Sequence, residues 1–428
     1  MSLGYFWIFV LLMVIGAPVV FALLIGPALS LTLDGQPMYV RALLSRLYNG
    51  MDSFPLMAVP FFILAGELMN SGGITRAIVR FSETLIGHVR GGLAQINILS
   101  SILFAGLSGS AVADTSALGK MLVPAMEEAG YSKRFSAAVT AASSVIGPII
   151  PPSGIMIIYA FIMNVSVGGL FAAGIVPGFL VAVGLMLMTS RIAKARDYPV
   201  AAKKATWGER ADAFKSTILA LLTPVILLGG IILGIFTPTE AAAVAAFYAL
   251  VVGLFFMRSL NTRDLPIIFR NVAQQSGVIL LLVGSAVTFA WIITVSGMAE
   301  QLATALTSIT DNILLLLFLV NIFLLIVGMF LDAGPAILIL GPVLGPIFIG
   351  LGIEPLHFAI VMCVNVTVGL ATPPMGLVLF VASSISGEKV DRIAQEMLPF
   401  LAVEIGVIFL ITYFPAISLT IPRLLGFL

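Results

Sequence analysis

Long apolar runs recur along the whole chain and restrict what it can fold into. A helix needs about 20 consecutive apolar residues to cross a bilayer, and most of the runs approach or exceed that length. They cover residues 5–29, 56–69, 135–163, 170–190, 217–236, 241–257, 278–295, 313–330 and 400–419. Only 10% of the 428 residues are charged, which is too few to cover the surface of a soluble protein of this size. The sequence therefore predicts an all-α integral membrane protein.

The first run is predicted to be a single retained membrane span. No positively charged segment precedes residues 5–29 and no small-residue cleavage site follows them, as a signal peptide would require. The net charge is only +1, and the basic residues are distributed over the loops. The charge pattern therefore gives no indication of nucleic-acid binding.

Residues 144–154, with the sequence SVIGPIIPPSG, interrupt the run 135–163 with three prolines and two glycines. Proline lacks the backbone N–H and its ring clashes with the preceding turn, so this run cannot form one continuous helix. At such a break the carbonyl groups lose their intrahelical donors and can bind a hard monovalent cation. The N-terminus of the following half-helix can bind an anion. The break therefore predicts a binding site.

The same pattern of prolines and glycines occurs a second time. Residues 122–160 align without a gap on residues 344–382, which places the pair Pro151–Pro152 on the pair Pro373–Pro374. Matching breaks at matching positions in two halves are the sequence sign of a transporter built from repeats, with its binding site at the broken helices.

The distribution of basic residues predicts how the two repeats are oriented. Lys and Arg concentrate in the cytoplasmic loops of membrane proteins, and the basic loop 191–215 is therefore placed in the cytoplasm. The segment before the first break, EEAGYSKR, is then basic and cytoplasmic, whereas its counterpart GLGIEPLH carries no Lys or Arg and lies on the other side. This predicts two inverted repeats, residues 1–190 and 216–428.

An apolar segment with small or turn-forming residues in its middle precedes each break. The two segments, residues 91–128 and 312–350, contain FAGLSGSAVADTSALG and GMFLDAGPAILILGP. The charge distribution fits only if each enters and leaves on the same face, so both are predicted to be re-entrant helical hairpins. Irregular backbone at membrane depth must be surrounded by protein or water. The hairpin tips should therefore meet the broken helices 135–163 and 357–385.

The tips and the breaks are predicted to form two cation sites. The first is assigned to Gly106, Ser108, Ser110, Gly147, Ile150 and Ser153. The second is assigned to Gly328, Asp332, Gly334, Gly369, Thr372 and Met375. Proline kinks that only help helices to pack are the alternative interpretation, and the symmetric placement of two breaks beside two hairpins argues against it.

Carboxyl groups inside apolar segments are functional candidates because they are costly to place in a membrane. Asp114 and Asp332 lie in the two hairpins. Asp114 is expected to contact the substrate or the coupling ion, with a structural hydrogen bond to the tip as the alternative. Glu240, in FTPTEAA, is interpreted as an N-terminal helix cap. Glu67 and Glu404 are expected near span ends or in local pairs.

Motifs of ATP-driven transport and of catalysis are missing from the sequence. The chain contains no P-loop of the form GxxxxGK[ST] and no recognisable Ser-His-Asp order. Its two histidines, His88 and His357, are too far apart in the sequence to suggest a metal site. A passive channel would show a continuous polar stripe, and a membrane scaffold would not need paired prolines. These observations favour a secondary transporter that is not an enzyme.

The motifs FAGLSGSAVADTSALG, GPIIPPSG and GLATPPMG together resemble the large membrane subunit of the TRAP (tripartite ATP-independent periplasmic) transporters, the DctM-like family. The resemblance covers essentially the whole chain. It implies an elevator-type fold of the ion-transporter superfamily in the bacterial inner membrane. It also implies sodium-driven import of an organic acid of the C4-dicarboxylate or sialic-acid type, with sodium ions at the tips and breaks. It points to Ser108, Ser110 and Asp114 as substrate contacts, to which we add Ser153 at the first break.

The resemblance also implies two protein partners. These are a small four-helix membrane subunit and a soluble periplasmic binding protein that delivers the acid. Because the repeat begins almost at residue 1, we expect the small subunit to be a separate chain. A stand-alone anion transporter coupled to sodium or protons is the alternative. The sequence does not choose between the acids, because no intramembrane Lys or Arg marks a carboxylate site.

Overall fold

The structure is a computed structural model that describes residues 4–36, 38–199, 204–310 and 312–428, without the side chains at positions 107, 108, 299, 306, 307 and 309. The regular elements in these ranges are all helices. Eight of the described helices are long and apolar enough to cross a membrane, and the bent pair Lys133–Ile149 and Gly154–Met163 makes a ninth if it is one span. The prediction of an all-α, multi-pass membrane protein is confirmed.

The described residues form two successive sets of helices. The first set is α1 (Gly4–Val14), α2 (Val19–Leu33), α3 (Met38–Met51), α4 (Ala58–Ser71), α5 (Ile74–Ile86), α6 (Gly92–Ser108), α7 (Ala111–Glu128), α8 (Lys133–Ser144), α9 (Ile146–Ile149), α10 (Gly154–Met163) and α11 (Val167–Ala195). The second set is α12 (Trp207–Ile232), α13 (Pro238–Val251), α14 (Leu265–Ser296), α15 (Met298–Ile309), α16 (Ile313–Phe330), α17 (Ala333–Gly350), α18 (Pro355–Gly369), α19 (Leu377–Ser386), α20 (Val390–Tyr413) and α21 (Ala416–Leu424).

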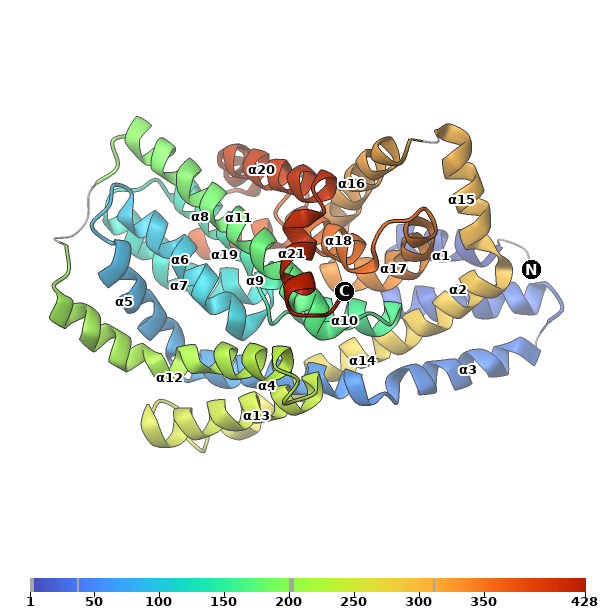
Figure 1. The fold of residues 1–428 in the computed structure, drawn as a ribbon, viewed down its shortest axis with the longest axis horizontal. Helices are drawn as coiled ribbons and strands as arrows, with labels where there is room; N and C mark the ends of the chain where they lie inside the picture. The colour runs from blue at the N-terminus through green and yellow to red at the C-terminus, as the bar shows by residue number, and fades with distance from the viewer. Residues whose placement is uncertain (1–3, 37, 200–203, 311) are drawn as a thin grey trace.

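The two sets share the same order of elements. Each begins with two helices that pack on each other, continues through a two-helix hairpin (α6–α7 or α16–α17) and a broken helix, and then has a long helix. The opening pairs are exchanged between the halves. Helices α12 and α13 pack on α5 and α4, whereas α2 packs on α14 (Figure 1). Each half is therefore completed by helices from the other half.

The prediction of a single span over residues 5–29 is wrong. Helix α1 ends at Val14, the chain reverses direction, and α2 begins after Pro18. The run therefore forms two short helices that pack on each other. Gly16 has a φ of +83°, a conformation that glycine adopts without strain. A Cβ atom added at Gly26 would lie 3.1 Å from the Tyr5 carbonyl oxygen, so the two helices are in close contact. The turn at Gly16 and Pro18 was not predicted because the run is apolar on both sides of it.

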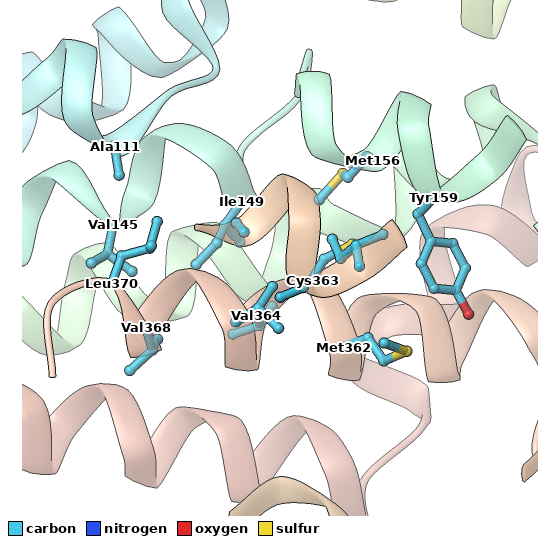
Figure 2. Packing of buried hydrophobic residues seen from close by; sticks show 14 of the residues in the cluster. Ala111, Val145, Ile149, Met156, Tyr159, Met362, Cys363, Val364, Val368 and Leu370 are labelled. Carbon is cyan, nitrogen blue, oxygen red and sulfur yellow. The ribbon is translucent and has the colours of Figure 1, made fainter. Parts of the chain in front are cut away.

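The two helices that precede the breaks form the centre of the molecule. Every residue of α8 from 135 to 144 and every residue of α18 from 356 to 369 is buried. Small side chains in α8 allow neighbouring helices to approach closely. Helix α9, which ends at Ile149 just before the first break, packs against α18 (Figure 2). The central packing therefore brings the two breaks next to each other.

The structure also places two of the isolated acids. Glu240 forms a capping box with Thr237, in which its carboxylate accepts a hydrogen bond of 2.8 Å from the Thr237 backbone N–H. The interpretation of Glu240 as a helix cap is confirmed. Glu404, expected near a span end or in a local pair, instead lies in the middle of α20 and is fully buried. The expectation for Glu404 is wrong because α20 is covered by helices from both halves of the chain.

Candidate functional site

The tip of the first hairpin lies against the first break. Gly109 joins α6 to α7 with a φ of +58°. A Cβ atom added at Gly109 would lie 3.1 Å from the Pro152 carbonyl oxygen and 3.4 Å from Ser153 Cα. A Cβ atom added at Gly106 would lie 3.8 Å from the Pro151 carbonyl oxygen and 2.7 Å from the Pro224 side chain. Glycines thus allow the backbone of the tip to touch the backbone of the break.

The first break separates two half-helices that meet at an angle of 40°. Ile150 has an extended backbone, and the cis peptide bond between Pro151 and Pro152 follows it. Ser153 then caps α10, since its Oγ accepts a hydrogen bond of 3.5 Å from the Met156 backbone N–H. The last carbonyls of a helix have no intrahelical partner. The break therefore supplies carbonyl oxygens on one side and N–H groups on the other.

The second tip and break are joined in a corresponding way. A Cβ atom added at Gly328 of α16 would lie 2.9 Å from Gly369 Cα of α18, so the two backbones touch. The Gly376 backbone N–H donates a hydrogen bond of 3.1 Å to the Met329 carbonyl oxygen. Thr372, within the break, is buried and donates from its Oγ1 to the Val368 carbonyl oxygen at 2.9 Å.

Asp114 connects the first hairpin to the first break. It lies in the first turn of α7 and is fully buried. One of its carboxyl oxygens, Oδ2, lies against Gly147 of α9, where a Cβ atom would overlap it. The positive end of the α7 dipole favours a negative charge at this position. The structure therefore brings together Asp114 and Gly147, which sequence reasoning assigned to the substrate and to sodium respectively.

A cavity of about 370 Å³ lies where the tips, the breaks and the helices α4 and α14 converge. The first turns of three helices line it: Ala111–Ala113 of α7, Gly154 and Ile155 of α10, and Ala333–Pro335 of α17. Residues of α4 and α14 form another part of the wall. The polar side chains in the lining are those of Glu67, Asn70, Ser110, Gln275 and Asp332. None of the described residues that line the cavity is Lys or Arg.

The predicted site residues differ in how they meet this cavity. Ser110 and Asp332 line it and cap α7 and α17, with Oδ1 of Asp332 accepting from the Ala333 backbone N–H at 2.8 Å. Gly334 also lines it. Met375 does not, and this residue is 46% exposed. The side chain of Ile150 turns towards Gly178 of α11.

The remaining predicted residues lie behind the lining, at the junctions between tips and breaks. They are Gly106, Asp114, Gly147, Ser153, Gly328, Gly369 and Thr372. Ser108 ends α6, and its side chain lies outside the described part of the chain.

Sequence reasoning missed the wall of the cavity that α4 and α14 provide. Glu67 and Asn70 lie three residues apart in α4, and Gln275 lies in the first half of α14. Polar residues at helical spacing beside an apolar run are a signal for Glu67 and Asn70. No comparable sequence signal distinguishes Gln275 from the adjacent Gln274.

Comparison with known proteins agrees with this arrangement. The SiaM sialic acid TRAP transporter large permease protein of Vibrio cholerae is 39% identical over 96% of this chain and 95% of that protein. The DctM C4-dicarboxylate TRAP transporter large permease protein of Pseudomonas aeruginosa is 37% identical over 91% of each chain. The YdaH transporter of Alcanivorax borkumensis has a similar fold, with a TM-score of 0.64 over 87% of this chain and 88% of that structure at 18% identity.

The match to a family covers nearly the whole chain. The sequence profile described as tripartite ATP-independent periplasmic transporter, DctM component, matches residues 6–417. This identifies a multi-pass transport protein of the bacterial inner membrane and not an enzyme. The chain therefore belongs to the DctM family, the large permease components of the TRAP transporters.

Proposed function

We propose that this permease imports an organic acid, such as sialic acid or a C4-dicarboxylate, together with sodium ions, and that the acid binds in the cavity between the two hairpin tips. The lining of this cavity is the main support for the proposal. Three helix N-termini converge there, and they are the groups available to bind an anion because none of the described lining residues is Lys or Arg. Backbone N–H groups at helix N-termini bind anions. The volume of about 370 Å³ falls in the usual range of roughly 300–1,000 Å³ for small-molecule sites.

Sodium ions bind, in this proposal, at the two junctions between tip and break. The carboxyl group of Asp114 beside Gly147 supports the first site. The contact of Gly328 with Gly369 and the buried Thr372 support the second. Carbonyl oxygens exposed at helix breaks are suitable ligands for sodium.

The charge of the cavity gives a reason for coupling. An anionic acid that enters alone meets the carboxyl groups of Glu67 and Asp332, which line the same cavity. Like charges close together disfavour each other, whereas cations bound nearby favour the anion. Coupling between two ligands is reciprocal, so the acid should also strengthen the binding of sodium.

Transport then requires one body to move past another. The tips and breaks form one side of the cavity, and α4 and α14 form the other. We propose that the hairpins and broken helices carry the acid past α4 and α14 in an elevator movement, with residues 1–190 and 216–428 as inverted repeats and both hairpins re-entrant. A separate small membrane subunit and a periplasmic binding protein complete the system, in keeping with the tripartite family.

Reconstitution tests the proposal. The permease is placed in liposomes with its small subunit, the binding protein is added outside, and uptake of labelled sialic acid and of a labelled C4-dicarboxylate is followed. We expect uptake of one of these classes only with an inward sodium gradient and with the binding protein present. Uptake that needs no binding protein, or that follows a proton gradient instead, would support the stand-alone alternative. No uptake of any acid by correctly inserted protein would refute the proposal.

A further inference from the structure

Glu404 is a fully buried carboxyl group that lies outside the proposed transport site. It lies in the middle of α20, with no exposed surface. Among the described residues, none forms a hydrogen bond with its Oε1 or its Oε2. None of the described residues that line the cavity belongs to α20. The group therefore needs an explanation of its own.

The helices around α20 offer no counter-charge at this depth. Helix α20 packs against α8, α11, α16, α18 and α19. The sequences of α16 and α19 contain no titratable residue. The basic residues of α8 and α11 lie at helix ends; they are Lys133, Arg134, Arg191 and Lys194.

Other charged and titratable groups on α20 and α18 already have partners. Arg134 and Arg196 both form ion pairs with Glu396, two turns before Glu404 on α20, at 3.2 and 2.7 Å. On α18, the two ring nitrogens of His357 are 2.8 Å from Ser418 Oγ and 3.2 Å from the Thr412 carbonyl oxygen. The other titratable group of α18, Cys363, is a buried free thiol and not a cation. No described cation or donor therefore compensates an ionised Glu404.

An uncompensated carboxylate is strongly disfavoured in such surroundings, because burial removes its hydration without replacing it. A metal ion would need several further oxygen ligands. The described residues contain no cluster of three or more His, Cys, Asp or Glu side chains that could hold one. A proton removes the charge with no further ligand. We propose that Glu404 binds a proton at neutral pH and that this proton is structural and takes no part in ion coupling.

The second part of this proposal follows from the position of Glu404 and rests on the proposed sodium coupling. Four of the helices that pack on α20, namely α8, α16, α18 and α19, are hairpin or broken-helix segments of the body that we propose to move, and the fifth, α11, packs on α6 and α18 of the same body. A group enclosed within one body stays buried while that body moves. Its proton is then not exchanged during transport, and a neutral side chain of the same shape should replace it.

Infrared spectroscopy and uptake measurements test the two parts separately. At neutral pH the component of the acid C=O stretching band that belongs to a protonated Glu404 should be present in the parent protein and lost in Glu404→Gln. The matched control is Glu396→Gln on the same helix, which removes an ion-paired carboxylate and should leave that band unchanged. Sodium-driven uptake by Glu404→Gln should equal that of the parent.

If no component of the acid band is lost in Glu404→Gln relative to the parent, then Glu404 is ionised and the proton assignment is overturned, whatever the transport result. If the band is lost but the folded variant no longer takes up the acid, the proton is functional and the second part is overturned. A Glu404→Gln protein that fails to fold would also contradict the proposal, since the neutral isostere should pack as the protonated acid does.

Discussion

Replacement of Gly369 by Ala tests whether the second tip and break must touch. A Cβ atom at Gly369 would lie 2.5 Å from Gly328 Cα and 2.7 Å from Gly328 C, both of which are backbone atoms. Ordinary Cβ contacts are 3.4–4 Å, so α16 and α18 must separate by about 1 Å in a closely packed interior. Overpacking of this kind costs about 1–3 kcal/mol. The separation also strains the hydrogen bond from the Gly376 N–H to the Met329 carbonyl oxygen.

If the second sodium ion binds at this junction, Gly369→Ala should mainly weaken the binding of sodium. A penalty of about 1–3 kcal/mol on the sodium-bound state corresponds to about a 5- to 150-fold weaker response to sodium. The measurement is the sodium concentration that gives half-maximal uptake of the acid in proteoliposomes, with thermal unfolding measured in parallel. The control is Gly350→Ala at the end of α17 in the second hairpin, where an added Cβ meets nothing within 4 Å. A Gly369→Ala protein with the sodium response and stability of the parent would refute the reasoning.

Three further substitutions test other parts of the site. Asp114→Asn should lower sodium-driven uptake by about tenfold or more without loss of membrane expression, because a charged hydrogen-bonding group contributes about 1.5–3 kcal/mol. The control is Asp391→Asn, since Asp391 is exposed at the start of α20. Full activity of Asp114→Asn would contradict the assignment of Asp114. Thr372→Ala should impair uptake by removing the hydroxyl that donates to Val368, whereas Thr372→Ser should retain activity; equal uptake by both variants would count against a role for the hydroxyl. Gln275→Ala should raise the KM for the acid by about 2- to 10-fold, the equivalent of one hydrogen bond, with an unchanged sodium response. The control is Gln274→Ala, since Gln274 does not line the cavity. An unchanged KM in Gln275→Ala would show that α14 does not contact the acid.

Local chemistry determined the features that the sequence predicted well. The length of an apolar run is set by bilayer thickness, so most spans could be located. Proline removes a backbone hydrogen bond from a helix and its ring crowds the preceding turn, so the breaks at the paired prolines Pro151–Pro152 and Pro373–Pro374 could be predicted from the sequence. Turn-forming residues likewise placed both hairpin tips, at Gly109 and at Leu331–Asp332. These are properties of short segments, and they hold whatever the rest of the chain does.

Packing between distant segments decided the rest. Asp114 meets Gly147, and Gln275 reaches the same cavity as Ser110, only because α4, α7, α9 and α14 converge there. Burial of Glu404 likewise depends on the packing of α20 against helices from both halves of the chain. An amphipathic pattern reports which side of a helix is apolar, but in a chain that is apolar on nearly every side it cannot say which helix will cover it. The partners of these residues were therefore fixed by the tertiary structure, because close approach and exclusion of water depend on atoms far away in the sequence.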